Sequence, residues 1–303
     1  MRLGLGLGLG KSRGGQAGGA TGILDSYTGA TFAFAPDTLI YSNHSVEDTA
    51  VGSETEVDSP NPGDNPAAPY TVRVRRSTTP SAVRSFTHTE VSDGTLVTWV
   101  GVGNDGFVEA AYDQSGNDNH ATQSTAGNQP KIVDAGSLVV ENGKAALDFD
   151  GVNDWMKAES IGSHNSHLLT ILSRWDSGYL HSIGYTLPES TILFRSSLSF
   201  NLFQNIAEDQ LNVSITPSRN IISVDRSNLD INLALDGTIE ASLVSSSILN
   251  GPGLNHEIGW AEERNNAAQY LNGAIQVVLY FDSDQSANRT AIETAINNEY
   301  SIY

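Results

Sequence analysis

Two hairpin signals constrain the fold of this chain more than any other feature of its sequence. In SLVVENGKAALDFDG (137–151), Asn142-Gly143 supplies the two residues that a type I′ turn holds at positive φ. In LDINLALDGTIEASL (229–243), apolar residues alternate with polar ones up to Asp236-Gly237. Alternation with a period of two places the apolar side chains on one face of a strand. These two stretches therefore predict antiparallel hairpins in a turn-rich β protein.

Other segments extend this β pattern and add one helix. YTVRVRRS (70–77) alternates like a half-buried strand, whereas AIQVVLYF (274–281) is apolar on both faces and is typical of a central strand. SDQSANRTAIETAINNEYSIY (283–303) has apolar residues at helical spacing after Ser283 or Asp284 as the N-cap. We expect an all-β sandwich that ends in a C-terminal helix.

Composition excludes several classes of function. The 303 residues contain no cysteine, which rules out disulfides, thiolate catalysis and cysteine zinc sites. The net charge of −19 would repel a phosphate backbone, so we expect no nucleic-acid partner. No apolar run is long enough for a membrane span, and the first residues lack the continuous apolar run of a secretory signal. We also expect no cofactor and no metal site.

The first residues form a glycine-rich arm. Residues 1–22 are set apart from an expected sandwich at 23–303, which carries an acidic loop insertion at 46–69. Four leucines would share one side of the arm in an extended chain; they are Leu3, Leu5, Leu7 and Leu9. The bare other side suits strand addition to a second subunit. We expect the arm to anchor the protein to a partner; the alternative is that it packs on its own sandwich.

One segment carries a family resemblance. The string AYDQSGNDNHATQ (111–123) resembles the YDQSGNGNHLTQ motif in the catalytic domain of fungal α-L-arabinofuranosidase B, which is a concanavalin-like jelly roll. The same motif recurs in bacteriophage and bacterial proteins of laminin-G-like fold. In the phage-type sequences it lies between segments similar to VRVRRS (72–77) and ENGKAALDFDGVNDW (141–155). The resemblance implies a concanavalin-like (laminin-G-like) jelly-roll sandwich.

The resemblance also implies where catalytic carboxylates would stand. Glu189 in GYTLPEST matches the place of the family's nucleophile, while GWAEE (259–263) stands where the family has the acid-bearing GGDNS, leaving Glu262 or Glu263 as a substitute. A retaining glycosidase needs two carboxylates about 5 Å apart. Because the family's adjacent cysteines and its acid are missing here, we favour no catalytic residue; if the chain is a glycosidase, the pair is Glu189 and Glu262.

Three tryptophans are candidates for stacking against a sugar, namely Trp155, Trp175 and Trp260. The alternative is that they belong to the core of the sandwich, as most tryptophans in such folds do.

The first function that we infer is a structural component of a bacteriophage virion, such as a tail, fibre or capsid-surface protein. It would be made in the host cytoplasm, form a homo-oligomer and contact other virion proteins through its arm. A carbohydrate-binding module, which could recognise a host-surface glycan, and an arabinofuranosidase-like hydrolase are the alternatives.

Overall fold

The computed structural model describes residues 21–42, 70–78, 82–159, 161, 166–183, 192–195, 199–204, 209–214, 219–244, 255–261 and 269–303. The four leucines of the arm and the acidic segment 46–69 lie outside these described residues. The described strands all pair antiparallel and form two main sheets. The all-β sandwich expected from the sequence is therefore confirmed.

The first sheet has β23 and β12 at its centre, with β17, β18 and β19 following in that order and β1 and β10 on the other edge of β23. Its strands are β1 (Phe32–Phe34), β10 (Leu147–Asp150), β12 (Ser166–Ser177), β17 (Arg219–Ser227), β18 (Asp230–Leu235), β19 (Thr238–Val244) and β23 (Asn272–Phe281). The predicted central strand is confirmed, since β23 is paired along both edges and its residues 273–281 are all buried.

The second sheet runs in the order β3, β2, β4, β5, β11, β20, β13, β14, β15 and β16. Its strands are β2 (Tyr70–Arg76), β3 (Ala82–Thr87), β4 (Gly106–Ala111), β5 (Ala121–Thr122), β11 (Met156–Ala158), β13 (His181–Ile183), β14 (Ile192–Arg195), β15 (Ser199–Gln204), β16 (Asp209–Ser214) and β20 (His256–Ile258). β6 (Lys131–Asp134) pairs with both β4 and β10 and so joins the two sheets.

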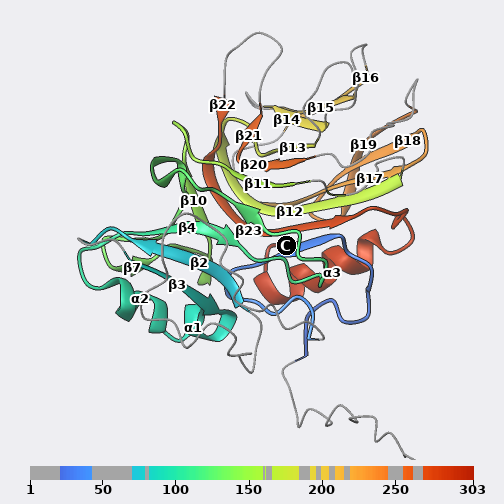
Figure 1. The fold of residues 1–303 in the computed structure, drawn as a ribbon. Helices are drawn as coiled ribbons and strands as arrows, with labels where there is room; N and C mark the ends of the chain where they lie inside the picture. Colours follow the sequence, from blue (N-terminus) through green and yellow to red (C-terminus); the bar gives the residue numbers. More distant parts are fainter. Residues whose placement is uncertain are drawn as a thin grey trace, which may run out of the picture.

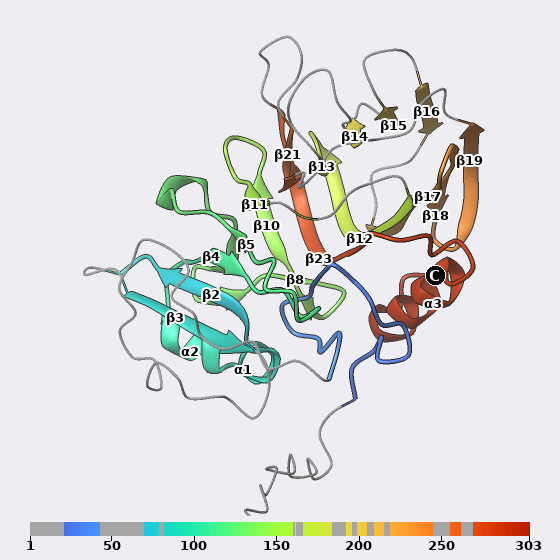
Figure 2. The same ribbon diagram turned by 45° about the vertical axis from the view of Figure 1, so that its right-hand side comes forward.

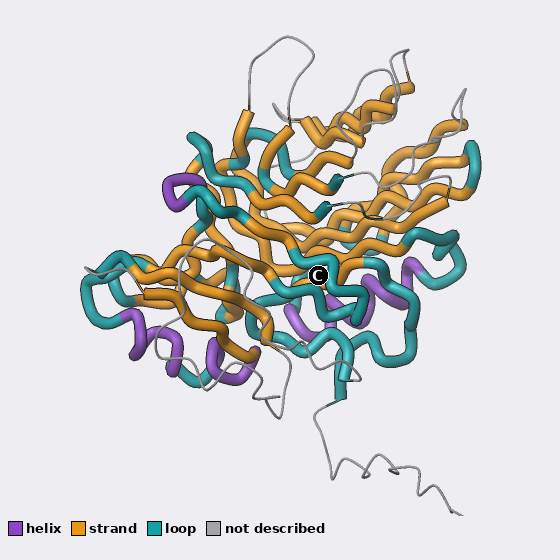
Figure 3. The backbone as a smooth tube through the Cα atoms, in the orientation of Figure 1, coloured by secondary structure: helices purple, strands orange, loops and turns teal. Residues whose placement is uncertain are grey.

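The remaining elements are short except for one helix. They are β7 (Ser137–Leu138), β8 (Val140–Glu141), β9 (Lys144–Ala145), β21 (Trp260–Ala261), β22 (Gln269–Tyr270), α1 (His88–Ser92), α2 (Thr95–Val100), the 3-10 turn η1 (Ala126–Asn128) and α3 (Arg289–Tyr300). Figure 3 shows how strands dominate the described chain, with the helices at its margin.

Two buried clusters lie on opposite faces of the first sheet. Along β12, Leu169 and Ile171 join the cluster between the sheets, whereas Leu168 and Leu172 join a second cluster with α3. The alternation follows from the period of two along a strand. Figures 1 and 2 show α3 and residues 21–42 on the side of β12 and β23 that faces away from β11, β13 and β20.

The two hairpin predictions are confirmed at their turns. Asn142 and Gly143 have φ of 51° and 80°, and Asp236 and Gly237 have 46° and 84°, as a type I′ turn requires. The start of the helix was predicted wrongly. Asp284 accepts hydrogen bonds from the Ser227 hydroxyl and the Ser286 N–H, so it fixes a turn before the helix, and α3 begins five residues later at Arg289.

The motif that carries the family resemblance has a structural role. The Asp113 carboxylate accepts backbone N–H groups at 2.9–3.1 Å from Ala33, Ser115 and Asn119. The Gln114 amide accepts the Ile40 N–H and donates to the carbonyls of Ala35 and Thr38. Both side chains are fully buried, so their bonds satisfy the backbone of residues 33–40 where water cannot. The motif thus holds residues 33–40 against the sandwich. This structural role explains why the motif indicates the fold.

Candidate functional site

Three aromatic rings meet where β11 begins and where β20 and β22 end. The ring centroids of Trp155 and Trp260 are 5.0 Å apart, and those of Trp260 and Tyr270 are 6.3 Å apart with the rings nearly parallel, at 18°. All three side chains are partly exposed. We call Trp155, Trp260 and Tyr270 the aromatic cluster. Each ring has an apolar face and a polar N–H or O–H edge, and the Nε1 atom of Trp260 is itself buried.

Backbone hydrogen bonds fix the position of Trp155. The residue directly precedes β11, its N–H donates to the Asn128 carbonyl at 3.1 Å, and its own carbonyl accepts the Gln123 amide at 3.0 Å. The neighbouring Asn153 side chain also donates to the Gly127 carbonyl at 2.8 Å. Residues 150–155 are therefore tied to the turn at η1, and Trp155 enters the cluster on a rigid support.

A glycine sets the direction of Trp260. Gly259 links β20 to β21 at φ +81°, and an added Cβ would lie 2.5 Å from the Phe149 ring, so both conformation and space require glycine here. Its N–H donates to the Leu180 carbonyl at 2.8 Å, and its carbonyl accepts the Leu271 N–H at 2.8 Å. These bonds bring Trp260 into register with Tyr270 across β21 and β22.

Acidic residues flank Trp155 in the sequence. Asp154 is 6% exposed and accepts the Asp150 N–H at 3.1 Å. Burial, followed by repulsion from Asp150, raises the pKa of Asp154 to about 7. Glu159 is 72% exposed and forms an ion pair with Lys157 at 2.9 Å. The segment around Trp155 is therefore acidic, and the charge of Lys157 is paired with that of Glu159.

The structure brings together two of the three tryptophans selected from the sequence. Trp175 is excluded because it is only 4% exposed, belongs to the core between the sheets and donates its Nε1–H to the Gly178 carbonyl at 3.1 Å. Sequence reasoning missed Tyr270. The signal available for it was its place four residues before the apolar run 274–281, but nothing in the sequence indicates which residue faces it.

The proposed carboxylate pair lies outside the described residues. Glu189 falls between β13 and β14, and Glu262 and Glu263 fall between β21 and β22. β13 and β20 are antiparallel partners, with His181 opposite Ile258 and Ile183 opposite His256. The two connections therefore leave this strand pair from opposite ends.

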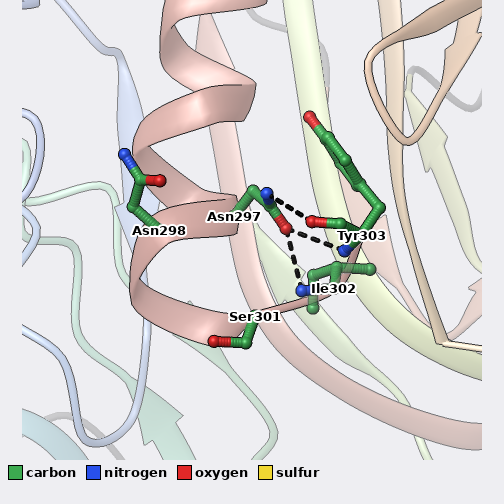
Figure 4. Close-up of a pocket in the computed structure, with 5 residues that line it drawn as sticks. All are labelled: Asn297, Asn298, Ser301, Ile302 and Tyr303. Atoms are coloured by element: carbon green, nitrogen blue, oxygen red, sulfur yellow. Dashed lines mark hydrogen bonds between the residues drawn. The ribbon is translucent and has the colours of Figure 1, made fainter.

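A second surface feature lies at the end of α3. Figure 4 shows a shallow pocket lined by Asn297, Asn298, Ser301, Ile302 and Tyr303. The Asn297 carboxamide accepts the N–H groups of Ile302 and Tyr303 and donates to the Tyr303 carbonyl, at 2.8–2.9 Å. Because Asn297 is occupied in holding residues 301–303, we assign no ligand to this pocket.

The described part of the chain carries no cluster of metal ligands. No three histidine or acidic side chains converge there in a way that could hold a metal ion. Among the helices described, none is long and apolar enough to cross a membrane.

The two packed sheets and the cluster at strand ends define the class as an antiparallel β-sandwich with a solvent-accessible aromatic surface. Two solved structures share this fold: a GH54 α-L-arabinofuranosidase soaked with a cyclic sulfate inhibitor (TM-score 0.61) and an arabinofuranosidase complexed with arabinofuranosyl-α-1,2-xylobiose (TM-score 0.63). Each matches at 13% identity over 92% of this chain, which spans 64% of the length of either neighbour. No family model matches the sequence, and no curated protein matches it. The resemblance to arabinofuranosidase B thus holds for the fold.

Proposed function

We propose that this protein binds carbohydrate through the aromatic cluster of Trp155, Trp260 and Tyr270. The observation that carries the proposal is the contact of three partly exposed rings, each positioned by backbone hydrogen bonds or strand pairing. The apolar face of a sugar ring can pack on an indole ring while its hydroxyls stay hydrated or bond to polar edges. The fold shared with two arabinofuranosidases is consistent with this proposal.

The charge around the cluster favours a neutral glycan. The chain carries a net charge of −19, and Asp150 and Glu159, five residues before and four residues after Trp155 in the sequence, are exposed. An anionic sugar would meet like charge on approach and would gain little from Lys157, which pairs with Glu159. We therefore expect neutral pentose or hexose oligosaccharides to bind in preference to sialylated or uronic ones.

Tryptophan fluorescence titration tests the proposal. Neutral arabino- and xylo-oligosaccharides are compared with a sialylated one, using the full chain and the variants Trp155→Ala and Trp260→Ala. We expect each variant to raise Kd about tenfold or more, which corresponds to ~1.4 kcal/mol. Tyr303→Ala is the matched control, because Tyr303 is 56% exposed and lies at the end of α3. Equal affinity in all variants, or binding of the sialylated sugar alone, would overturn the proposal.

Hydrolysis of an α-L-arabinofuranoside is the second candidate function, and the shared fold favours it. It would require Glu189 and Glu262 to act as nucleophile and acid, as the resemblance implies. The measurement is turnover of a chromogenic α-L-arabinofuranoside by the full chain and by the Glu189→Gln, Glu262→Gln double variant. An enzyme of this kind loses all turnover in the double variant; equal rates in the two proteins exclude the pair.

A role in a bacteriophage particle remains our proposal from the sequence resemblance alone. In it, the arm with Leu3, Leu5, Leu7 and Leu9 anchors the sandwich to other virion proteins, and the aromatic cluster meets a host-surface glycan. Detection of the chain in purified particles and loss of assembly on deletion of residues 1–22 would support it. A monomer whose state is unchanged by that deletion would remove the anchoring role.

A further inference from the structure

A row of buried rings crosses the interior of the sandwich behind the aromatic cluster. His181 of β13 lies 5.2 Å from His256 of β20, His256 lies 4.3 Å from Tyr280 of β23, and Tyr280 lies 5.8 Å from His167 of β12, measured between ring centroids. All four side chains are at most 1% exposed. Figure 1 shows β13 and β20 on one side of this interior and β12 and β23 on the other.

His181 makes no side-chain hydrogen bond to any described residue. Neither of its ring nitrogens has a partner in that part of the chain, and burial alone lowers its pKa from 6.5 to about 3. The group facing it is His256, with Tyr280 and His167 behind. Arg226 of β17, the fully buried register partner of His167, adds a positive charge at the far end of the row.

Two carboxylates adjoin the row in sequence, Glu257 next to His256 and Asp282 two residues after Tyr280, and neither neutralises His181. Glu257 alternates to the opposite face of β20 from His256. Burial, followed by the charge of Asp282, raises the pKa of Tyr280, but Asp282 lies beyond the end of β23. Among the described residues, a proton on His181 would therefore place a second positive charge, besides that of Arg226, in the interior without an anion to offset it.

Pairing of β13 with β20 places His181 and its neighbour Leu180 next to the residues that lead into Trp260. His181 is the register partner of Ile258, and the carbonyl of the preceding residue, Leu180, accepts the Gly259 N–H at 2.8 Å. That same glycine sets the direction of Trp260. Separation of β13 from β20 would break this bond, which ties the residue next to Trp260 to β13.

We propose that the aromatic cluster is gated by acid: protonation of His181 separates β13 from β20 and displaces Trp260. That the displacement releases a bound glycan rests on the function proposed above; the displacement itself does not. At low pH the equilibrium shifts towards a conformation in which the imidazole of His181 is exposed to water. The shift occurs because the pKa of the ring is lowered in the closed form and has its ordinary value in the open form. The open form is favoured increasingly as the pH falls below 6.5, the unperturbed value, towards about 3.

Hydrogen exchange of the ligand-free full chain tests the gate. The Gly259 amide is followed from pH 8 to pH 4, with its rate divided by that of an unfolded peptide at each pH. We expect its protection to fall at least tenfold below pH 6 in the wild-type chain and to stay constant in His181→Phe. His181→Gln, also neutral and non-titrating, serves if the Phe variant does not fold. His88→Gln, which removes a histidine of α1, is the control and should behave as wild type.

The Ile292 amide in α3, which donates to the Asn288 carbonyl, reports on the rest of the molecule. If it loses protection together with Gly259, the transition is global unfolding and the gate is refuted. The gate is also refuted if His181→Phe responds to acid as wild type does. Failure of every glycan to bind would remove the proposed function while leaving this measurement intact. Binding that is unaffected by acid, despite loss of Gly259 protection, would separate the gate from glycan release.

Discussion

Arg289 and His181 are buried on opposite faces of the first sheet, and their polar groups are satisfied to very different degrees. On the side of α3, Arg289 bonds to both oxygens of Glu293 at 2.7 and 2.8 Å and to Asp225 at 3.1 Å, while the Tyr300 hydroxyl donates to Thr38 at 2.9 Å. Between the sheets, His181 is equally buried and has no hydrogen bond to any residue that the structure describes.

The paired charges beside α3 stabilise the fold, whereas the buried histidine between the sheets can respond to a change in pH. Paired charges in a dry interior make any single loss expensive, because the remaining partner stays buried and unpaired. A neutral histidine in an apolar interior is tolerated as long as it stays neutral, and its protonation then acts against one local strand pair. We expect the α3 side to fail only with the whole fold and the aromatic-cluster side to open first.

Loss of the Arg289 guanidinium should have the largest effect on stability. Arg289→Met would leave Asp225 and Glu293, which are 2% and 0% exposed, as two buried carboxylates without their cation. We expect the free energy of unfolding to fall by about 3–5 kcal/mol, measured by urea denaturation at pH 7.

The matched control is the triple variant Arg289→Met, Asp225→Asn, Glu293→Gln, in which the charges are removed together. It should recover most of the loss, because neutral amides can be buried at a lower penalty than unpaired charges. A triple variant as unstable as the single one would show that α3 depends on packing by Arg289 rather than on its charge.

A neutral side chain at position 154 should change how stability depends on pH. Because the folded pKa of Asp154 is raised from 3.8 to about 7, the folded state binds a proton that the unfolded state has already lost in this interval. The free energy of unfolding therefore declines as the pH rises from 3.8 through 7. We expect Asp154→Asn to remove that decline and to be about 4 kcal/mol more stable than wild type at pH 8, with no difference at pH 3.5.

Comparison with His181 sharpens this measurement, because the two groups have opposite signs. His181→Phe should gain stability relative to wild type as the pH falls below 6.5, whereas Asp154→Asn should gain it as the pH rises above 4. Asp230→Asn at an exposed position controls for the loss of one negative charge. The contrast fails if both buried-site variants shift stability in the same direction.

Much of the fold could be predicted from local patterns. Asn142-Gly143 and Asp236-Gly237 specify their turns through φ alone, and the apolar run 274–281 is buried on both faces because it is central. The burial of Arg73 could not be predicted, because an arginine that alternates with Val72 and Val74 is expected on the solvent-facing side of its strand. In the structure, Arg73 is 1% exposed and forms an ion pair with Glu109 at 3.0 Å.

The candidate site was only half predictable. Trp155 and Trp260 could be selected as aromatic residues, but their contact spans more than a hundred residues of sequence and depends on the pairing of β11 with β20. Trp175 has the same chemistry and is core, because its strand runs through the middle of the first sheet. The local sequence gives the type of each residue and the periodicity of each strand. Whether a side chain at a strand end is exposed depends on which strands pair with one another, and the local sequence does not give this.

The smallest effect should come from the contact between the 142–143 turn and α3. The Asn142 amide donates to the carbonyls of Tyr300 and Ser301 at 3.1 and 3.2 Å. Asn142→Gly keeps the positive φ and removes only these bonds, so we expect a loss of about 1 kcal/mol or less in global stability. Exchange of the Ser301 amide, which donates to Asn297, should accelerate several-fold. Asn228→Gly is the control at another turn, with φ +55°, and should leave Ser301 unchanged. Equal exchange in both variants would mean that the last turn of α3 is held by its packing alone.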